Sequence, residues 1–153
     1  MTTRRKQRLP LEDYAVEGST WHVTINVERR NGNLFHSHHF GKEVLECFVK
    51  ACETDSAVVH VICIMPDHLH CLVEVRSVSL IKVIGRAKSA TTRIWWARGG
   101  TNALWQESFH DPGIRERQDF DATVNYILNN PVEARLVAGW ESYPLIGGTL
   151  IAG

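Results

Sequence analysis

The stretch AVVHVICIMPDHLHCLVEV, residues 57–75, contains two strongly apolar segments separated by a Pro-Asp pair. Residues 57–65 form an almost continuous apolar run, which is typical of a strand in the middle of a sheet. Residues 68–75 alternate and are rich in strand-forming types, which indicates a second strand. Because the two segments are joined by so short a turn, they predict an antiparallel hairpin at the centre of the fold.

Alternation along the second strand separates its side chains into two sets, since successive residues point to opposite faces of a sheet. One set is wholly apolar and must face the core: Leu69, Cys71, Val73 and Val75. The other set places His68 and His70 side by side, where two neutral imidazoles can hold one divalent cation. His-x-His is a short pattern, so spacing alone leaves open the alternative of two ordinary strand histidines.

The remaining elements are predicted from β-branched alternation, from three-to-four-residue apolar spacing and from capping signals. They are a strand at 21–27, a helix at 40–53, a helix capped by Ser79 and ending near Trp96, a strand within 109–115, and a helix from Asp119 to about Asn130 that Pro131 stops. The order β-α-β-β-α-β-α predicts an α+β fold. We expect a ferredoxin-like or RRM-like antiparallel sheet with helices on one face, plus a C-terminal helix.

Length and composition are those of one globular domain. The chain has 153 residues, 44% of them hydrophobic, and 17 basic and 17 acidic residues that cancel to a net charge of zero. We expect a basic N-terminal arm at residues 1–17 and a single domain at 18–153.

No apolar run approaches the ~20 residues of a membrane helix, and no apolar signal core follows the basic N-terminus, so a cytoplasmic protein is expected. The four cysteines form no C-x-x-C pair and are interpreted as reduced, buried thiols.

Basic residues follow one stripe of the predicted helix at 79–96. Lys82, Arg86 and Arg93 recur at helical spacing, and no acidic residue occurs between Ser77 and Gln106. A solvated helix face usually mixes both signs, whereas a stripe of one sign favours contact with a polyanion. Further basic residues in the arm, Arg4 and Arg5 among them, add a second positive patch.

The last predicted helix carries a tyrosine and a carboxamide four residues apart. Tyr126 and Asn130 therefore lie on a common flank, beside the apolar stripe of the helix. By itself this pair is also compatible with an ordinary amphipathic surface.

Several linked motifs resemble one known family. MPDHLH at 65–70 resembles the HUH motif of single-tyrosine transposases, and NYILNNPV at 125–132 resembles their tyrosine segment. GSTWHVT at 18–24 and LWQ followed by FHD within 104–111 are similar to two further segments, in the same order. The chain most resembles the REP-associated tyrosine transposases, relatives of the small insertion-sequence transposases, over roughly residues 14–143.

The resemblance implies a role for each matching residue. Tyr126 would be the nucleophile, and His68, His70 and Asn130 would hold a divalent metal ion, with Mg²⁺ or Mn²⁺ suited to such ligands and water. The implied activity is a metal-dependent single-stranded DNA endonuclease and strand transferase that forms a 5′-phosphotyrosine intermediate at hairpin, REP-like DNA.

The resemblance also implies partners. The opening segment, Gly18, Ser19, Thr20 and Trp21, together with the basic arm, would recognise a short tetranucleotide beside the hairpin. The partner would be single-stranded or hairpin DNA, with no membrane, and the protein would act as a monomer or as a homodimer that exchanges the tyrosine helix.

Three other functions each match part of the sequence, and the sequence argues against two of them. A histidine-triad nucleotide hydrolase needs a third histidine where Leu72 stands, and a two-histidine phosphoesterase needs a second copy of the motif at 22–24, which is not found. A non-enzymatic RRM-like nucleic-acid-binding domain stays open, and it predicts exposed aromatic residues on the sheet and no metal affinity.

Overall fold

A five-stranded antiparallel sheet forms the centre of the molecule. The structure is a computed structural model that describes residues 11–110, 113–114 and 117–151. The strands are β1 (Thr20–Asn26), β2 (Val58–Met65), β3 (His68–Glu74), β4 (Gly113–Ile114) and β5 (Ile146–Gly147). Their order is β4-β1-β3-β2-β5, so β3 lies between β1 and β2. The predicted central hairpin is confirmed as β2 and β3.

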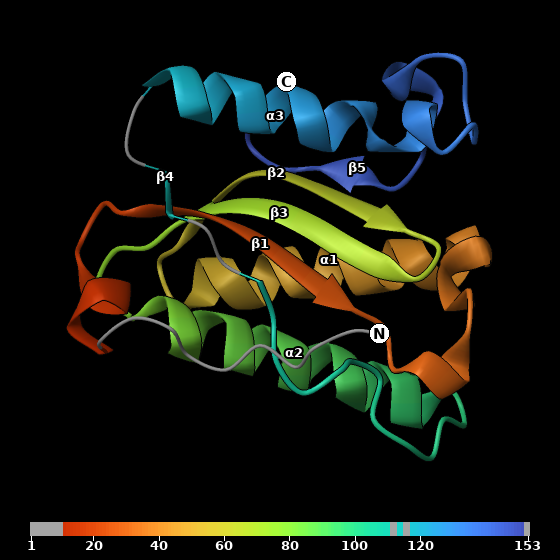
Figure 1. Cartoon of the computed structure of the whole chain (residues 1–153). Helices are drawn as coiled ribbons and strands as arrows, with labels where there is room; N and C mark the ends of the chain where they lie inside the picture. The colour runs from red at the N-terminus through yellow and green to blue at the C-terminus, as the bar shows by residue number, and fades with distance from the viewer. Residues whose placement is uncertain (1–10, 111–112, 115–116, 152–153) are drawn as a thin grey trace.

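Helices cover both faces of the sheet in unequal numbers. Figure 1 shows α1 (His38–Thr54) and α2 (Leu80–Ala97) packed on one face and α3 (Arg117–Glu133) lying across the other. This confirms the predicted α+β arrangement, with helices on one face and a C-terminal helix added. Short 3-10 helices connect these elements: η1 (Leu11–Ala15), η2 (Arg29–Asn31), η3 (Leu34–His36) and η4 (Trp140–Ser142). In the described part of the chain, no helix is both long enough and apolar enough to cross a bilayer.

The main core lies between the sheet and the pair α1 and α2. Alternate residues of the central strands, such as Ile25 and Leu69, are fully buried there. Phe48 of α1 and Ile84 of α2 are equally buried. Ser79 begins α2 as predicted, since its side chain accepts a hydrogen bond from the backbone N–H of Lys82. Burial of this apolar layer is the main contribution to the stability of the fold.

The opposite sheet face carries α3. Ile127, Leu128 and Pro131 bury the inner side of the helix. The chain then returns to the sheet, where the Tyr143 hydroxyl donates a hydrogen bond of 2.6 Å to the carbonyl of Ile64 and β5 pairs with β2. This return fixes the position of α3 over β2 and β3.

Two predicted boundaries are wrong. Pro131 does not stop the last helix, which runs from Arg117 to Glu133 with the proline inside it. Proline already has a helical φ, and its buried ring packs on the inner side of the helix, so the helix ends only at Glu133. The strand expected within 109–115 is reduced to β4 and an isolated bridge between Thr24 and His110. Residues 111–112 and 115–116 of that segment lie outside the described residues.

Part of the predicted arm at 1–17 packs on the domain. Tyr14, in η1, is fully buried and its ring stacks on Trp21 with centroids 5.1 Å apart. Residues 1–10, which include Arg4 and Arg5, lie outside the described part of the chain.

Buried thiols make the fold sensitive to alkaline pH. Burial raises the pKa of Cys52 and of Cys63 from 9.0 to about 12 and raises that of Cys71 as well. Thiols exposed by unfolding ionise near pH 9, which favours the unfolded chain. Stability is therefore expected to be intact below pH 9 and to fall as pH rises from 9 toward 12. Urea midpoints at pH 7.5 and pH 10 measure this loss. Cys52→Ala should make the difference between the two urea midpoints smaller than in the wild type. A difference as large as in the wild type would contradict the role given to the Cys52 thiol.

Candidate active site

Two imidazoles converge at the start of β3. The Nε2 atoms of His68 and His70 lie 3.2 Å apart, with the rings nearly perpendicular. The Nδ1 atom of His68 lies 2.8 Å from a carboxylate oxygen of Asp67, at the tip of the β2–β3 turn. His70 is only 5% exposed. The alternation predicted for this strand therefore does place both histidines on one face.

β1 supplies a second layer of contacts to His70. Thr24 lies directly opposite His70 in the β1–β3 register. The Nδ1 atom of His70 lies 3.0 Å from the Thr24 hydroxyl and 3.1 Å from Nε2 of His22, two residues earlier on the same face. Three histidines from two neighbouring strands thus form one cluster.

Burial keeps His22 and His70 of this cluster uncharged. Desolvation, with smaller effects of His68 and His22, lowers the pKa of His70 to about 3. Desolvation also lowers the pKa of His22. Both rings are therefore neutral at neutral pH, and a neutral imidazole has a free nitrogen lone pair with which to bind a cation.

The partners of the two Nδ1 atoms are compatible with tautomers that leave both Nε2 lone pairs facing inward. Asp67 accepts from Nδ1–H of His68, and the Thr24 hydroxyl can accept from Nδ1–H of His70. Both Nε2 lone pairs then face each other at 3.2 Å, which is repulsive unless a cation lies between them. Two nitrogens each ~2.1 Å from one ion, at angles of roughly 90–110°, are about 3.0–3.4 Å apart. The pair therefore fits a divalent metal ion.

Further protein ligands of the same kind are not at hand. Within the described residues, no group of three or more His, Cys, Asp or Glu side chains could hold a metal ion. Among the described residues, neutral oxygens of a carboxamide such as Asn130, together with water, are left as candidates for additional ligands.

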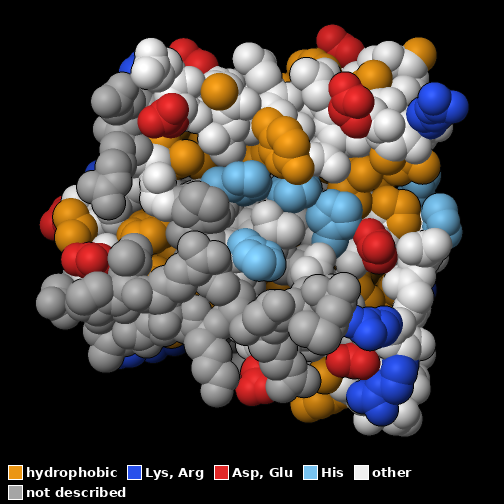
Figure 2. Space-filling view, viewed as in Figure 1, with side chains coloured by type: hydrophobic (Ala, Val, Ile, Leu, Met, Phe, Trp, Pro, Cys, Tyr) orange, Lys and Arg blue, Asp and Glu red, His pale blue; other side chains and the backbone are white. Residues whose placement is uncertain are grey.

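Tyr126 lies over the histidine cluster. Its ring meets the rings of His70 and His22 edge-on, with centroids 5.5 and 5.8 Å apart. The residue is nevertheless 56% exposed, because it projects from the flank of α3 rather than from its buried side. Figure 2 shows histidine side chains gathered in a band across the middle of one face of the molecule. The phenol and the imidazoles thus meet at the surface, where a large substrate can reach them.

Asn130 lies one helical turn beyond Tyr126. α3 runs antiparallel to β3, so this turn leads toward the end of the strand that carries His68 (Figure 1). The two α3 side chains line a common surface hollow. Among the described residues, Asn130 makes no hydrogen bond to either imidazole, and its role as a metal ligand stays a prediction.

The opening segment predicted to bind DNA lies at the edge of the sheet. Gly18 has a φ of +82°, which favours glycine, and its N–H donates to the carbonyl of Val75 at 2.7 Å. Ser19 and Thr20 line a surface hollow beside β4. Trp21 also lines it but is 4% exposed, and its indole N–H donates to Ser19. Trp21 therefore supports this segment from the core side.

The basic stripe of α2 lies on the other side of the sheet from Tyr126. Lys82, Arg86 and Arg93 are all exposed, as predicted. Arg86 forms an ion pair with Asp55 at 2.8 Å, so part of its charge is compensated. The structure does not bring this stripe to the histidine cluster.

His22 and Thr24 were not predicted as site residues. Both lie in the predicted strand at 21–27, and alternation places them on one face. A signal was therefore present, but it needed the pairing of β1 with β3 to connect these residues with His70.

Comparisons with known proteins agree with the motif resemblance. The family model described as "Transposase IS200 like" matches residues 15–130. The chain is 24% identical over 130 residues to a REP-associated tyrosine transposase of Escherichia coli strain K12, covering 83% of this chain and 76% of that protein.

Two solved structures are similar in fold. The structure of a REP-associated tyrosine transposase bound to a REP hairpin has a TM-score of 0.73 at 23% identity, covering 95% of this chain and 82% of that one. The crystal structure of a protein from Deinococcus radiodurans R1 that is described as a transposase has a TM-score of 0.51 at 18% identity. The match covers 82% of this chain and 96% of that one.

The contact between Thr24 and His70 gives a test of the proposed ligand orientation. Thr24→Val removes the hydroxyl that accepts from Nδ1–H of His70, and removal of such a supporting group commonly weakens metal affinity 10–100-fold. Because His22 still contacts the same nitrogen, we expect a decrease of about tenfold in Mn²⁺ affinity by calorimetry. Thr24→Ser should bind like the wild type, and equal affinity of Thr24→Val would contradict the assignment.

Proposed function

Because this chain belongs to the IS200-like transposase family, we propose that it cuts and rejoins single-stranded DNA at hairpins through a covalent bond to Tyr126. The observation that carries the proposal is the meeting of the Tyr126 ring with His70, whose Nε2 atom lies 3.2 Å from that of His68. A nucleophile and a pair of metal-ligating nitrogens are the parts that such a reaction needs.

Tyr126 would act as the nucleophile. Its exposed phenol would attack the scissile phosphorus in line with the departing 3′-oxygen, and its proton would pass to solvent water as the new P–O bond forms. The P–O bond to the 3′-oxygen would break, and this oxygen would take up a proton from solvent water, which gives a free 3′-hydroxyl and a 5′-phosphotyrosine. Attack by a 3′-hydroxyl on this link reverses the step and rejoins strands, so no nucleotide cofactor is needed.

His68 and His70, with Asn130 as a third ligand, would hold Mg²⁺ or Mn²⁺. The bound ion would supply charge to stabilise the phosphate oxygens during attack. The other residues prepare this site: Asp67 orients His68, and Thr24 with His22 orients His70. Burial of His70 keeps its ring neutral and able to bind.

Tyr126 and the histidines of the proposed site come from the same chain in this structure. Tyr126 contacts the histidines of its own chain, and α3 packs against its own sheet through Ile127 and Leu128. This supports a monomer as the active unit, with the homodimer that exchanges α3 as the alternative.

The DNA partner is proposed by analogy with the solved relative that is bound to a REP hairpin. Ser19 and Thr20 at the edge of the sheet, with the arm that carries Arg4 and Arg5, would contact bases beside the hairpin. Lys82 and Arg93 lie across the sheet from Tyr126, so they would contact phosphates remote from the cleaved bond. The alternative of a non-enzymatic RRM-like domain is less well supported, because α3 covers the sheet face that would have to expose aromatic residues.

The nucleophile is tested by Tyr126→Phe. Wild type incubated with Mn²⁺ and a labelled hairpin oligonucleotide should give a cleaved strand and a covalent protein–DNA band on a denaturing gel. Tyr126→Phe should give neither, while it still binds the DNA, because only the attacking oxygen is removed. Tyr143→Phe is a matched control that removes a buried hydrogen bond and about 1 kcal/mol of stability but keeps the covalent band. Normal cleavage by Tyr126→Phe would refute the assignment.

The α2 stripe is tested by salt dependence. The double variant Lys82→Ala/Arg93→Ala should weaken hairpin binding, and the slope of log K against log salt should become shallower by up to about 0.9 for each phosphate that the variant no longer neutralises. Cleavage at saturating DNA should be unchanged, because the stripe is remote from Tyr126. Lys50→Ala, an exposed lysine of α1, serves as the control. An unchanged slope would remove the stripe from the DNA-binding surface.

A further inference from the structure

A polar hollow of about 220 Å³ lies next to His68, at the C-terminal end of β1. Its lining includes Asn26, Arg29, Asn33, Asp67 and Gln106. Asn26 pairs with His68 in the β1–β3 register, and Asp67 is hydrogen-bonded to the His68 ring. The hollow thus shares a wall with the proposed metal site but takes no part in the chemistry assigned to Tyr126.

The wall formed by Gln106 is held in place by several hydrogen bonds. The backbone N–H of Gln106 donates to the carbonyl of Asn26 at 2.8 Å, and its side-chain amide donates to the carbonyl of Val27 at 3.4 Å. Lys88 donates to the carbonyl of Gln106 at 2.7 Å. Val27 N–H in turn donates to the carbonyl of Asp67 at 2.9 Å.

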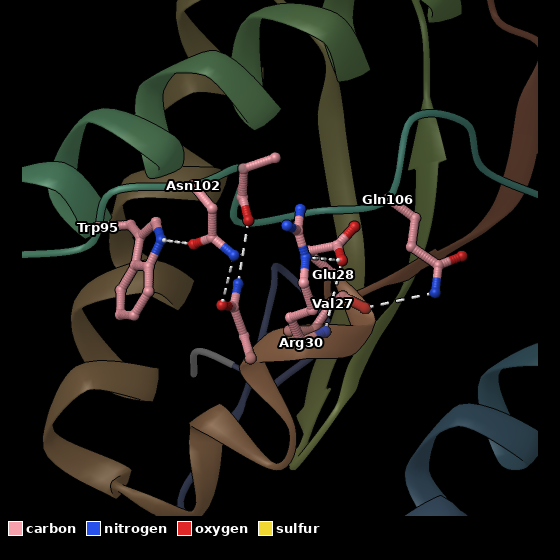
Figure 3. A network of polar contacts seen from close by, with 8 residues as sticks. Val27, Glu28, Arg30, Trp95, Asn102 and Gln106 are labelled. Atoms are coloured by element: carbon pink, nitrogen blue, oxygen red, sulfur yellow. Dashed lines mark hydrogen bonds and ion pairs between the residues drawn. The ribbon is translucent and has the colours of Figure 1, made fainter.

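A network of polar contacts behind this wall joins two loops (Figure 3). Asn102 accepts from the Trp95 indole at 3.1 Å and donates to the Asn31 side chain at 2.9 Å. Asn31 also donates to the carbonyl of Ala103 at 3.0 Å, whereas the contact of Arg30 with Glu28 at 3.0 Å stays within the loop after β1. The loop after β1 and the loop after α2 are therefore fixed relative to each other. Groups preorganised in this way bind a ligand at a smaller entropy cost.

Three polar side chains around the hollow are available to bind a ligand. Within the described part of the chain, the Asn26 and Asn33 side chains make no hydrogen bond to protein. Arg29 has no acidic partner there, whereas the adjacent Arg30 is paired with Glu28. Carboxamides offer a donor and an acceptor side by side, which matches the edges of unpaired bases, and an uncompensated guanidinium favours phosphate.

We propose that this hollow binds the unpaired nucleotide next to the scissile phosphate, an inference that rests on the proposed function. Asn33 and Gln106 would bond the edge of its base, and Arg29 would contact its phosphate. Asp67 repels phosphate on the side nearest His68, so the base rather than the phosphate lies there. The volume is below the roughly 300–1,000 Å³ of whole small-molecule sites, which suits one part of a longer ligand. The hollow would make strand cleavage selective for the flanking base.

Binding of single nucleotides tests the subsite without any need for cleavage. Each of the four deoxynucleoside monophosphates is added to ¹⁵N-labelled protein, and the side-chain amide signals of Asn26, Asn33 and Gln106 are followed by NMR. At least one nucleotide should shift these signals and saturate. Arg29→Ala should weaken this binding about tenfold, while the matched variant Arg30→Ala should bind like wild type. Unchanged amide signals with all four nucleotides, or equal shifts with inorganic phosphate alone, would overturn the proposal.

Oligonucleotides then test the subsite in the reaction. In the Tyr126→Phe background, replacing the base beside the mapped cleavage position by an abasic site should weaken hairpin binding about tenfold, and Asn33→Ala should remove this difference. Asn33 is exposed, so its variant should keep the wild-type urea midpoint. Suppose that the wild type forms a covalent adduct, but that neither the abasic site nor Arg29→Ala weakens binding. This result would refute the subsite alone. Absence of any adduct, with nucleotide shifts intact, would refute the proposed cleavage alone.

Discussion

The antiparallel register of β1 and β3 is the constraint on which the site depends. It places Thr24 opposite His70 and brings His22 to the same ring nitrogen, at 3.0 and 3.1 Å. Because side chains alternate along a strand, a slip of one residue would turn His68 and His70 toward α1 and α2. That slip would also expose Leu69 to the polar face. Burial of the apolar β3 residues therefore fixes the orientation of the imidazoles. The same strand register is needed to pack the core and to assemble the site.

The polar face of the sheet is stable because its buried groups have partners. A buried imidazole without a hydrogen bond would cost free energy, and the contacts of His70 with Thr24 and His22 avoid that cost. α3 completes the environment from above through Ile127 and Pro131 while leaving the flank that carries Tyr126 exposed. One helix thus both buries His70 and presents the phenol beside it. This is why membership of the IS200-like transposase family is matched by a geometry that can support the proposed chemistry within one chain.

The sheet also separates the surfaces proposed to contact DNA. The hollow lies beside His68 at the C-terminal end of β1, and the flank that carries Tyr126 lies on the face covered by α3. Ser19 and Thr20 lie at the edge next to β4. Lys82 and Arg93 lie behind the sheet on α2. DNA that contacts all of these surfaces would have to pass around an edge of the sheet.

Local sequence patterns determined the parts of this protein that depend on neighbouring residues. Alternation after Asp67 predicted the β3 face with its two histidines, spacing of four predicted the flank shared by Tyr126 and Asn130, and Ser79 predicted the start of α2. Only the tertiary structure decided that His22 and Thr24 join His70, that Trp21 is a core residue, and that α3 continues through Pro131. Strand pairing and helix docking join residues 46 and 48 positions apart, as for Thr24 and His22 with His70. A short turn predicted that β2 pairs with β3, but no local pattern encodes that β1 lies next to β3, because that choice minimises the free energy of the whole packed core.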